Sequence, residues 1–217
     1  MNTHGKFQTD RLLGPLVLLV MAILLSGCGL MTFAVPLKPT VDHLPSASKI
    51  PLSVSIYYSP ELRSYKYEFG SQVWCNLRRP LYVLPIGQAS VTLFERLFSV
   101  MFHNTVTLES LPPAKPNLSV IIEPDIENVE CEWPDGSKPI IFQITYHFTL
   151  YSPTGEALAY WNVTGRGEST GGIFTNRDTK MGNAAELAME DAARKIATQL
   201  RDIPAVARLL HEEKATP

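Results

Sequence analysis

Alternation of hydrophobic and polar residues predicts several β-strands in the second half of the chain and one near residue 55. From Leu52 to Tyr58 every second residue is hydrophobic, the pattern of a half-buried strand. Residues 142–150 alternate in the same way, and a turn at 152–155 with Pro153 and Gly155 joins them to a return strand over 156–166. Shorter or less regular patterns predict further strands at 106–108 and 118–131 and an irregular excursion with one or two short strands over 61–85.

Hydrophobic residues at spacings of three and four predict two helices. The first covers 87–103, and the second covers 184–204, with Asn183 and Glu186 as its capping pair and Pro204 at its end. We expect Gly165 and Gly167 to lie in flexible backbone after the hairpin. The order of elements predicts an α+β two-layer sandwich, in which two helices pack on one face of a four- to five-stranded, mostly antiparallel sheet.

The first residues have the pattern of a secretory signal peptide. Lys6 and Arg11 precede an apolar run over 12–25, which small residues follow. The alternative is an N-terminal transmembrane anchor, but the run is shorter than the roughly 20 apolar residues that a membrane-spanning helix needs.

The ending Leu25-Ser26-Gly27-Cys28 resembles the lipobox of bacterial lipoprotein precursors. The resemblance implies cleavage after Gly27 and acylation of the thiol and the new amino terminus of Cys28. Glycine rather than aspartate at position 29 implies export to the outer membrane, with the protein lipid-anchored on its periplasmic face. We therefore expect a signal peptide (1–27), a proline-rich lipidated tether (28–49), one periplasmic domain (50–210) and a polar tail (211–217).

The chain has three cysteines. With Cys28 assigned to the lipid, Cys75 and Cys131 remain in an oxidising compartment, which favours a disulfide between them. Two buried thiols, or one reactive thiol, are the alternatives.

Composition and motifs exclude several functions. A net charge of −2 and 18% charged residues give no basic field for nucleic acid. The four histidines beyond the signal peptide lack the spacing of zinc ligands, and no nucleophile or phosphate-binding motif occurs, so we expect no catalytic residues, no metal and no cofactor besides the lipid on Cys28. Carboxylates around Asp125 leave a hydrolase open as an alternative, although a solvated strand edge explains them better.

One segment, residues 57–82, combines aromatic and basic residues, as interaction surfaces do. The alternative is that about half of its rings fill the core. The candidate binding residues in this segment are Tyr57, Tyr65, Tyr67, Trp74, Arg78 and Arg79.

The order of elements, with helices at 87–102 and 184–204 and a hairpin at 142–163, also resembles three groups of small envelope lipoproteins. These are the plug lipoprotein of the lipopolysaccharide translocon, the ring lipoproteins of curli and exopolysaccharide export, and the auxiliary lipoproteins of lipid-trafficking ABC transporters. The resemblance implies a non-catalytic accessory lipoprotein that assists assembly or transport in the bacterial cell envelope. It would bind an envelope protein, a second copy of itself, or a glycolipid or polysaccharide. A carboxylate-dependent hydrolase and a carrier with a cavity for a lipid or small ligand are the alternatives.

Overall fold

The computed structural model describes residues 32–41, 49–70, 81–111, 120–134, 138–170 and 176–215. Almost all of them belong to one compact unit, Phe33–Phe69 with Tyr82–Pro217. The predicted signal peptide and Cys28 lie outside the described residues. Among the described helices, none is long and apolar enough to cross a membrane.

A five-stranded sheet forms the centre of this unit, in the order β5-β2-β6-β7-β8. The pairs β6–β7 and β7–β8 are antiparallel, but β2 runs parallel to both β5 and β6. The sheet is therefore mixed rather than mostly antiparallel, because helix α3 carries the chain back across the sheet between β2 and β5. The strands are β2 (Ile50–Tyr57), β5 (Phe102–Leu108), β6 (Val120–Glu132), β7 (Ile140–Tyr151) and β8 (Ala157–Ser169).

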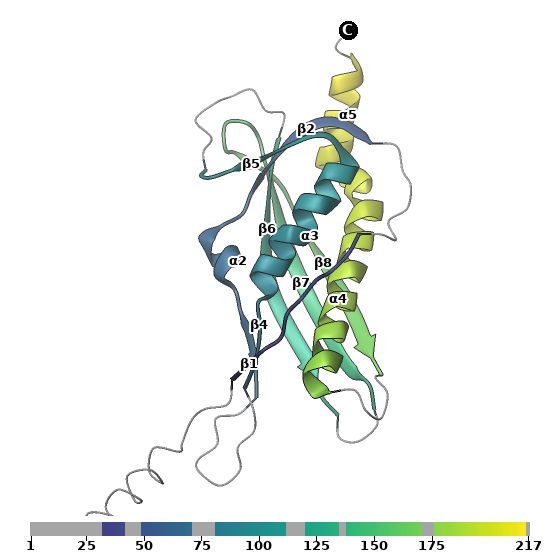
Figure 1. The fold of residues 1–217 in the computed structure, drawn as a ribbon. Helices are drawn as coiled ribbons and strands as arrows, with labels where there is room; N and C mark the ends of the chain where they lie inside the picture. Colours follow the sequence, from purple (N-terminus) through teal and green to yellow (C-terminus); the bar gives the residue numbers. More distant parts are fainter. Residues whose placement is uncertain are drawn as a thin grey trace, which may run out of the picture. The chain divides into compact units, whose positions relative to one another are not determined.

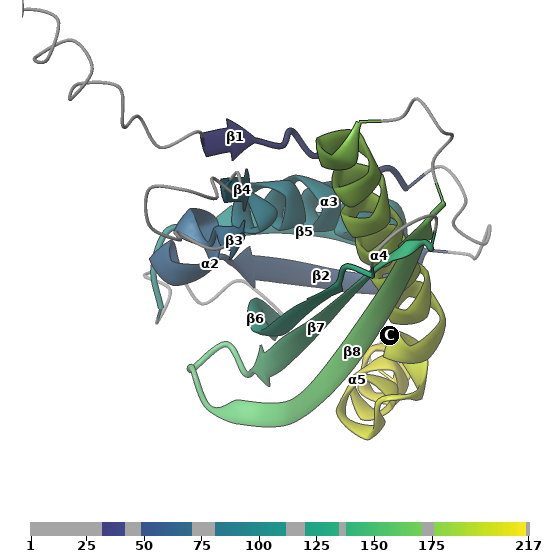
Figure 2. The same ribbon diagram turned by 90° about the horizontal axis from the view of Figure 1, so that it is seen from below.

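Two helices, α3 (Ile86–Met101) and α4 (Arg177–Gln199), pack on the same side of this sheet (Figures 1 and 2). The predicted α+β two-layer fold is thus confirmed. The ring of Phe94 in α3 lies edge-on to Tyr146 and Phe148 of β7, with centroids 4.9 and 5.6 Å apart. The Tyr146 hydroxyl is fully buried and is paired with Ser90 of α3 at 2.8 Å, so the polar atom in this core is satisfied.

The excursion before α3 contains the short helix α2 (Pro60–Ser64) and two strands of a second, three-stranded sheet. The order in this sheet is β1-β4-β3, with β1 (Thr32–Ala34), β3 (Tyr67–Phe69) and β4 (Leu81–Leu84). We expected one or two short strands here, and β3 and β4 are those strands. The contribution of β1, from the segment that we expected to be a tether, is new.

Residues 33–41 cross the helical layer instead of extending away from it (Figure 1). Val35 is buried, and the backbone N–H groups of Lys38 and Thr40 donate to Glu186 and Glu190 of α4. Hence part of the predicted tether packs on the domain. At the other end, η1 (Leu200–Asp202) leads into α5 (Pro204–Ala215), which continues into the predicted polar tail.

The start of the helix that we expected over 184–204 was predicted wrongly. Helix α4 begins at Arg177, one turn and a half before Asn183, and Asn176 is its N-cap residue. Its first turns lack a long hydrophobic stripe and contain Gly182, so the pattern resembles a loop. Tertiary packing stabilises these turns instead, because Met181 is fully buried and Gly182 lies beside Val35.

The expectation of flexible glycines was also wrong. Gly165 and Gly167 lie in the middle of β8, where α4 packs directly against the strand backbone. A Cβ atom on Gly165 would lie 2.0 Å from the carbonyl oxygen of Ala188, and one on Gly167 would lie 2.0 Å from that of Ala184. Glycines on the strand and alanines on the helix therefore allow the two backbones to approach closely.

We predict that Gly165→Ala lowers the free energy of unfolding by about 2 kcal/mol or more, because the new methyl group forces α4 away from β8. Urea unfolding followed by circular dichroism measures the change. Arg166→Ala is the matched control, since this exposed side chain lies between the two glycines and its removal should change stability by only about 0.5 kcal/mol. Equal stability of the two variants would contradict the packing argument.

Candidate functional site

The predicted binding residues separate into described and undescribed ones. Trp74, Arg78 and Arg79 lie outside the described residues. Tyr57 ends β2, and Tyr65 follows α2, where its carbonyl oxygen accepts the N–H of Gly87.

Tyr67 packs edge-on against Phe142 of the core, at 5.5 Å and 83°. Burial raises the pKa of its hydroxyl to about 12. Tyr65 packs against the core too. These two tyrosines therefore contribute to packing of the domain. This agrees with the alternative expectation, that about half of the rings of segment 57–82 fill the core.

A row of four aromatic rings does reach the surface next to them, and we call it the aromatic cluster: Phe33, Tyr82, Trp133 and Phe69. Each ring lies against the next, with centroid distances of 5.8, 5.7 and 5.2 Å along the row. Phe33 is 41% exposed, and the other three are half-buried. The four residues come from β1, β4, β3 and the end of β6, so the fold assembles the cluster from segments far apart in sequence.

The guanidinium of Arg177 lies 5.8 Å from the centre of the Trp133 ring, a cation–π arrangement. Arg177 is the first residue of α4, where the positive end of the helix dipole disfavours a cation. Helix stability does not explain an arginine at this position. Its guanidinium faces the aromatic cluster at the half-buried Trp133.

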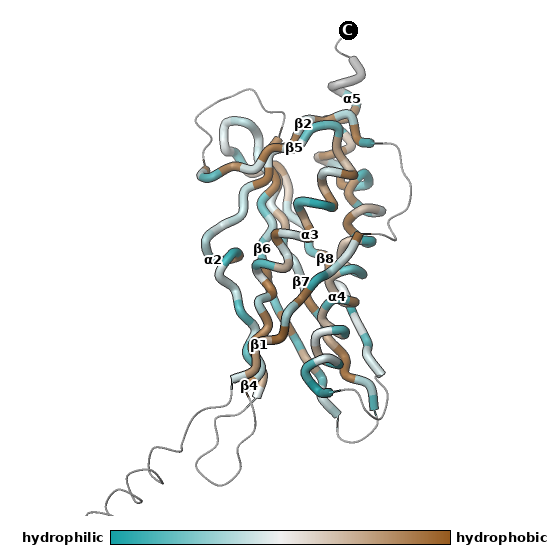
Figure 3. The backbone as a smooth tube through the Cα atoms, in the orientation of Figure 1, coloured by the Kyte–Doolittle hydropathy of each residue, from teal (hydrophilic) through white to brown (hydrophobic). Residues whose placement is uncertain are grey.

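A second surface, which we call the polar sheet face, consists of the side chains of β6, β7 and β8 that point away from α3 and α4. Hydrophobic and hydrophilic residues alternate along these strands (Figure 3), and residues paired across strands share a face. Phe148 pairs with Trp161 on the helix side, whereas His147 pairs with Asp125 and Asn162 on the other side. The polar sheet face includes Glu123, Asp125, Asn128, Glu130, Glu132, Gln143, Thr145, His147, Tyr160, Asn162, Thr164, Arg166 and Glu168.

A hydrogen-bonded chain lies in the middle of the polar sheet face. Asn162 pairs with the Nδ1 atom of His147 at 2.7 Å and donates to Glu127 at 2.6 Å. A register shift between Ile126 and Asn128 places Glu127 as an extra residue of β6, within reach of Asn162. The ring of Tyr160 stacks on His147 at 5.9 Å and is 65% exposed. These contacts fix the side chains while Tyr160 stays open to solvent.

The carboxylates that we considered for hydrolysis follow β6 on this face. Glu123 accepts a hydrogen bond from the hydroxyl of Tyr151 at 2.7 Å, and Asp125 accepts one from the N–H of Ile126. Burial, together with the Glu123 hydrogen bond and charge, raises the pKa of Tyr151 to about 12, so Tyr151 stays a donor. An acid pair for hydrolysis must converge in a pocket. The described carboxylates are instead distributed along one strand.

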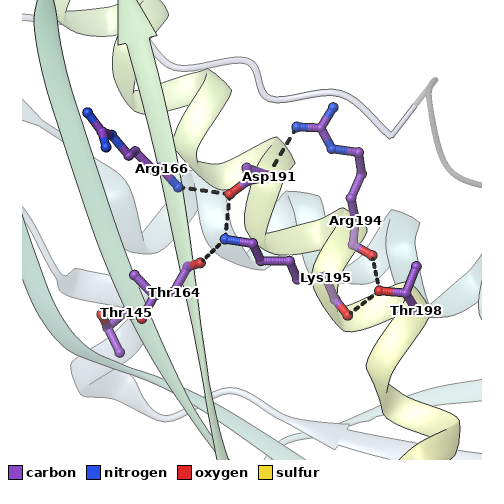
Figure 4. Close-up of polar contacts among 7 residues, drawn as sticks. All are labelled: Thr145, Thr164, Arg166, Asp191, Arg194, Lys195 and Thr198. Carbon is purple, nitrogen blue, oxygen red and sulfur yellow. Dashed lines mark hydrogen bonds and ion pairs between the residues drawn. The ribbon is translucent and has the colours of Figure 1, made fainter.

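The free edge of β8 is occupied by side chains of α4 (Figure 4). Asp191 accepts the backbone N–H of Arg166 at 3.0 Å, and the ammonium of Lys195 donates to the carbonyl oxygen of Thr164 at 2.6 Å. Asp191 and Lys195 are paired with each other at 2.8 Å. Two of the backbone groups that an added strand would need, the N–H of Arg166 and the carbonyl oxygen of Thr164, are thus already bonded, which disfavours pairing of this part of the edge with another chain.

The remaining predicted site residues are the cysteines. Cys131 is a half-buried free thiol in the structure, and its expected partner Cys75 lies outside the described residues, so the disulfide stays a prediction. The described ranges contain no group of three or more His, Cys, Asp or Glu residues that could hold a metal ion.

The predicted segment 57–82 contains Phe69 and Tyr82 of the aromatic cluster, but sequence reasoning missed Phe33, Trp133 and Arg177. Each is a single aromatic or basic residue in a segment with no unusual composition. Only the sheet register and the start of α4 bring them together, so no local signal could have identified them.

No known family model and no curated protein matches the sequence. Solved structures resemble it in part. A DUF330 protein from Xanthomonas campestris is 10% identical, with a TM-score of 0.48 over 86% of this chain and 99% of that one.

A minor lipoprotein from Acinetobacter baumannii is 8% identical, with a TM-score of 0.46 over 74% of this chain and 96% of its own. An uncharacterized lipoprotein B from Nitrosomonas europaea is 12% identical, with a TM-score of 0.38 over 76% of this chain and 95% of its own. At these scores the likenesses carry no argument about function.

We predict that Asp191→Asn destabilises the protein by about 1 kcal/mol at pH 7, because it weakens the bonds at the β8 edge. Burial alone would raise the pKa of Asp191, but hydrogen bonds from Lys195 and the Arg166 backbone outweigh it and hold the pKa below its ordinary value of 3.8. A lowered pKa in the folded state contributes stability above pH 3.8 that is lost as the pH falls through the folded value.

The difference in unfolding free energy between wild type and Asp191→Asn should therefore shrink as the pH falls below 3.8. Urea unfolding at pH 7 and at successive values below 3.8 measures it. Arg166→Ala, which removes an exposed side chain that stays charged throughout this pH range, should show no such trend. A difference that is constant with pH would contradict a role for the Asp191 charge.

Proposed function

We propose that the protein is a non-catalytic lipoprotein, anchored by lipid on Cys28 to the periplasmic face of the outer membrane, that docks a protein partner of the cell envelope. The signal-peptide pattern and the Leu25-Ser26-Gly27-Cys28 lipobox support the anchor. The domain supplies the binding surfaces.

The observation that carries this proposal is the polar sheet face. Its centre holds a fixed hydrogen-bonded chain, and an aromatic ring, Tyr160, is exposed above it. Ordered polar groups around an exposed tyrosine are typical of protein interfaces, where tyrosine is enriched. A purely solvated face would need neither the stacked ring nor the ordering.

The charge of the polar sheet face indicates the kind of partner. On the described part of this face, carboxylates of β6 and Glu168 of β8 outnumber the basic residues Arg166 and His147. An anionic glycolipid or polysaccharide would meet like charge here, whereas a protein segment with lysine or arginine would meet complementary charge. We therefore favour a protein partner with a basic docking surface over a glycan.

The edge of β8 supports docking by a face rather than by strand addition. Asp191 and Lys195 already satisfy the backbone groups of Arg166 and Thr164. A partner, or a second copy of the chain, cannot pair with β8 at Thr164 and Arg166 without displacing both side chains.

We predict that a photo-crosslinking amino acid at Tyr160 of the full-length protein yields one discrete cross-linked product in intact cells. The same amino acid at Val100 of α3, which is 51% exposed, is the matched control and should yield none. Mass spectrometry of the product distinguishes a heterologous partner from a second copy of the chain.

Charge reversal tests the electrostatic part of the proposal. Glu130→Lys should reduce the Tyr160 product several-fold, because it repels a basic partner. Equal cross-linking from Tyr160 and Val100, or a Tyr160 product unaffected by Glu130→Lys, would contradict docking on the polar sheet face.

A further inference from the structure

We propose that the aromatic cluster and Arg177 contact the headgroup region of the lipid bilayer and thereby fix the domain against the membrane. This inference rests on the lipid anchor of the proposed function. It concerns a different surface from the polar sheet face.

Chain length limits how far the cluster can be from the lipid. Phe33 follows Cys28 by only five residues. Even fully extended, five residues span at most about 18 Å. An acylated Cys28 lies at the bilayer surface, so Phe33 and the rings stacked behind it stay close to that surface in every conformation of the intervening residues.

Because residues 33–41 pack on the domain, the limit on the distance between Cys28 and Phe33 also limits the distance between the bilayer and the domain. Val35 is buried in the domain, and its N–H donates to the carbonyl oxygen of Val83 in β4 at 3.0 Å. The chain that leads from the lipid therefore enters the fold at Phe33 instead of after the whole predicted tether. Phe33 is the first aromatic residue after the anchor in sequence.

The chemistry of the cluster suits the bilayer interface. Tryptophan and tyrosine are enriched at membrane–water interfaces, where an apolar ring and a polar group meet their respective surroundings. The half-buried Tyr82 lies beside the exposed Phe33, and the half-buried Trp133 lies beside Tyr82. The guanidinium of Arg177, held over Trp133, supplies a cation for lipid phosphates.

A purely structural role leaves part of this arrangement unexplained. Ring stacking between β1, β4 and β3 stabilises the small sheet, but it does not require that Phe33 be 41% exposed. Nor does it require an arginine at the dipole-disfavoured start of α4. Contact with lipid accounts for both features.

Quenching of tryptophan fluorescence by brominated phospholipid tests the contact. The full-length lipidated protein with Trp74→Phe and Trp161→Phe retains Trp133 alone. In vesicles of phosphatidylcholine and phosphatidylglycerol, brominated acyl chains should reduce its emission about twofold relative to unbrominated vesicles, as for an interfacial tryptophan.

The control retains Trp161 alone, through Trp74→Phe and Trp133→Phe. Trp161 pairs with Phe148, six residues along β7 from Phe142, which Tyr67 contacts. Six residues along a strand separate Phe148 from Phe142 by about 20 Å. Trp161 therefore lies far from the aromatic cluster, and brominated lipid should leave its emission unchanged. In the Trp133 protein, Phe33→Ser should reduce quenching, whereas Tyr160→Ser, at an exposed aromatic residue of the polar sheet face, should not.

Intact mass of the same preparation separates the possible failures. An acylated protein whose Trp133 is no more quenched than Trp161 overturns the membrane contact and leaves the lipoprotein proposal standing. A protein without lipid on Cys28 overturns both. Circular dichroism of each variant ensures that a loss of quenching does not reflect unfolding.

Discussion

The close approach of α4 to β8 is the constraint on which most of this structure depends. Gly165 and Gly167 remove the side chains that would keep the helix away, and alanines of α4 fill the space that remains. At this separation Asp191 and Lys195 reach the edge of β8. The same packing places Arg177, at the start of α4, over Trp133. One helix–strand contact therefore protects a sheet edge and completes the aromatic cluster.

Elements with a strong period could be predicted from the sequence, and elements defined by packing could not. Strands β2, β7 and β8 and helix α3 follow regular alternation or a helical stripe, and the structure contains them close to the expected residues. The start of α4 was missed because Asn183 offers a plausible cap in the middle of a helix whose first turns are stabilised by burial of Met181. The parallel pairing of β2 depends on the path of the chain through α3, which no local pattern records.

The candidate sites show the same division. The polar alternation of β6 and β7 marks one face of the sheet as solvent-exposed, so the position of Asp125 and His147 there follows from sequence. The bulge that brings Glu127 to Asn162 does not, because one extra residue leaves no trace in the composition. The aromatic cluster joins residues from β1 to the end of β6, and its members become neighbours only through the order of the small sheet.

Anchoring and docking place different demands on affinity, and the two surfaces differ accordingly. A protein confined to a membrane meets a partner in the same membrane at a high effective concentration, so a modest intrinsic affinity suffices for docking. The polar sheet face, with its solvated carboxylates and a single exposed ring at Tyr160, suits such an interaction, because charge complementarity contributes more to orientation and encounter rate than to binding energy. In the proposed anchoring, the stacked rings of the aromatic cluster adjoin the anchor through Phe33, which follows Cys28 closely in sequence, and limit rotation of the domain. A domain held in this way presents its docking face in fewer orientations, and each orientation that is removed lowers the entropy cost of meeting the partner.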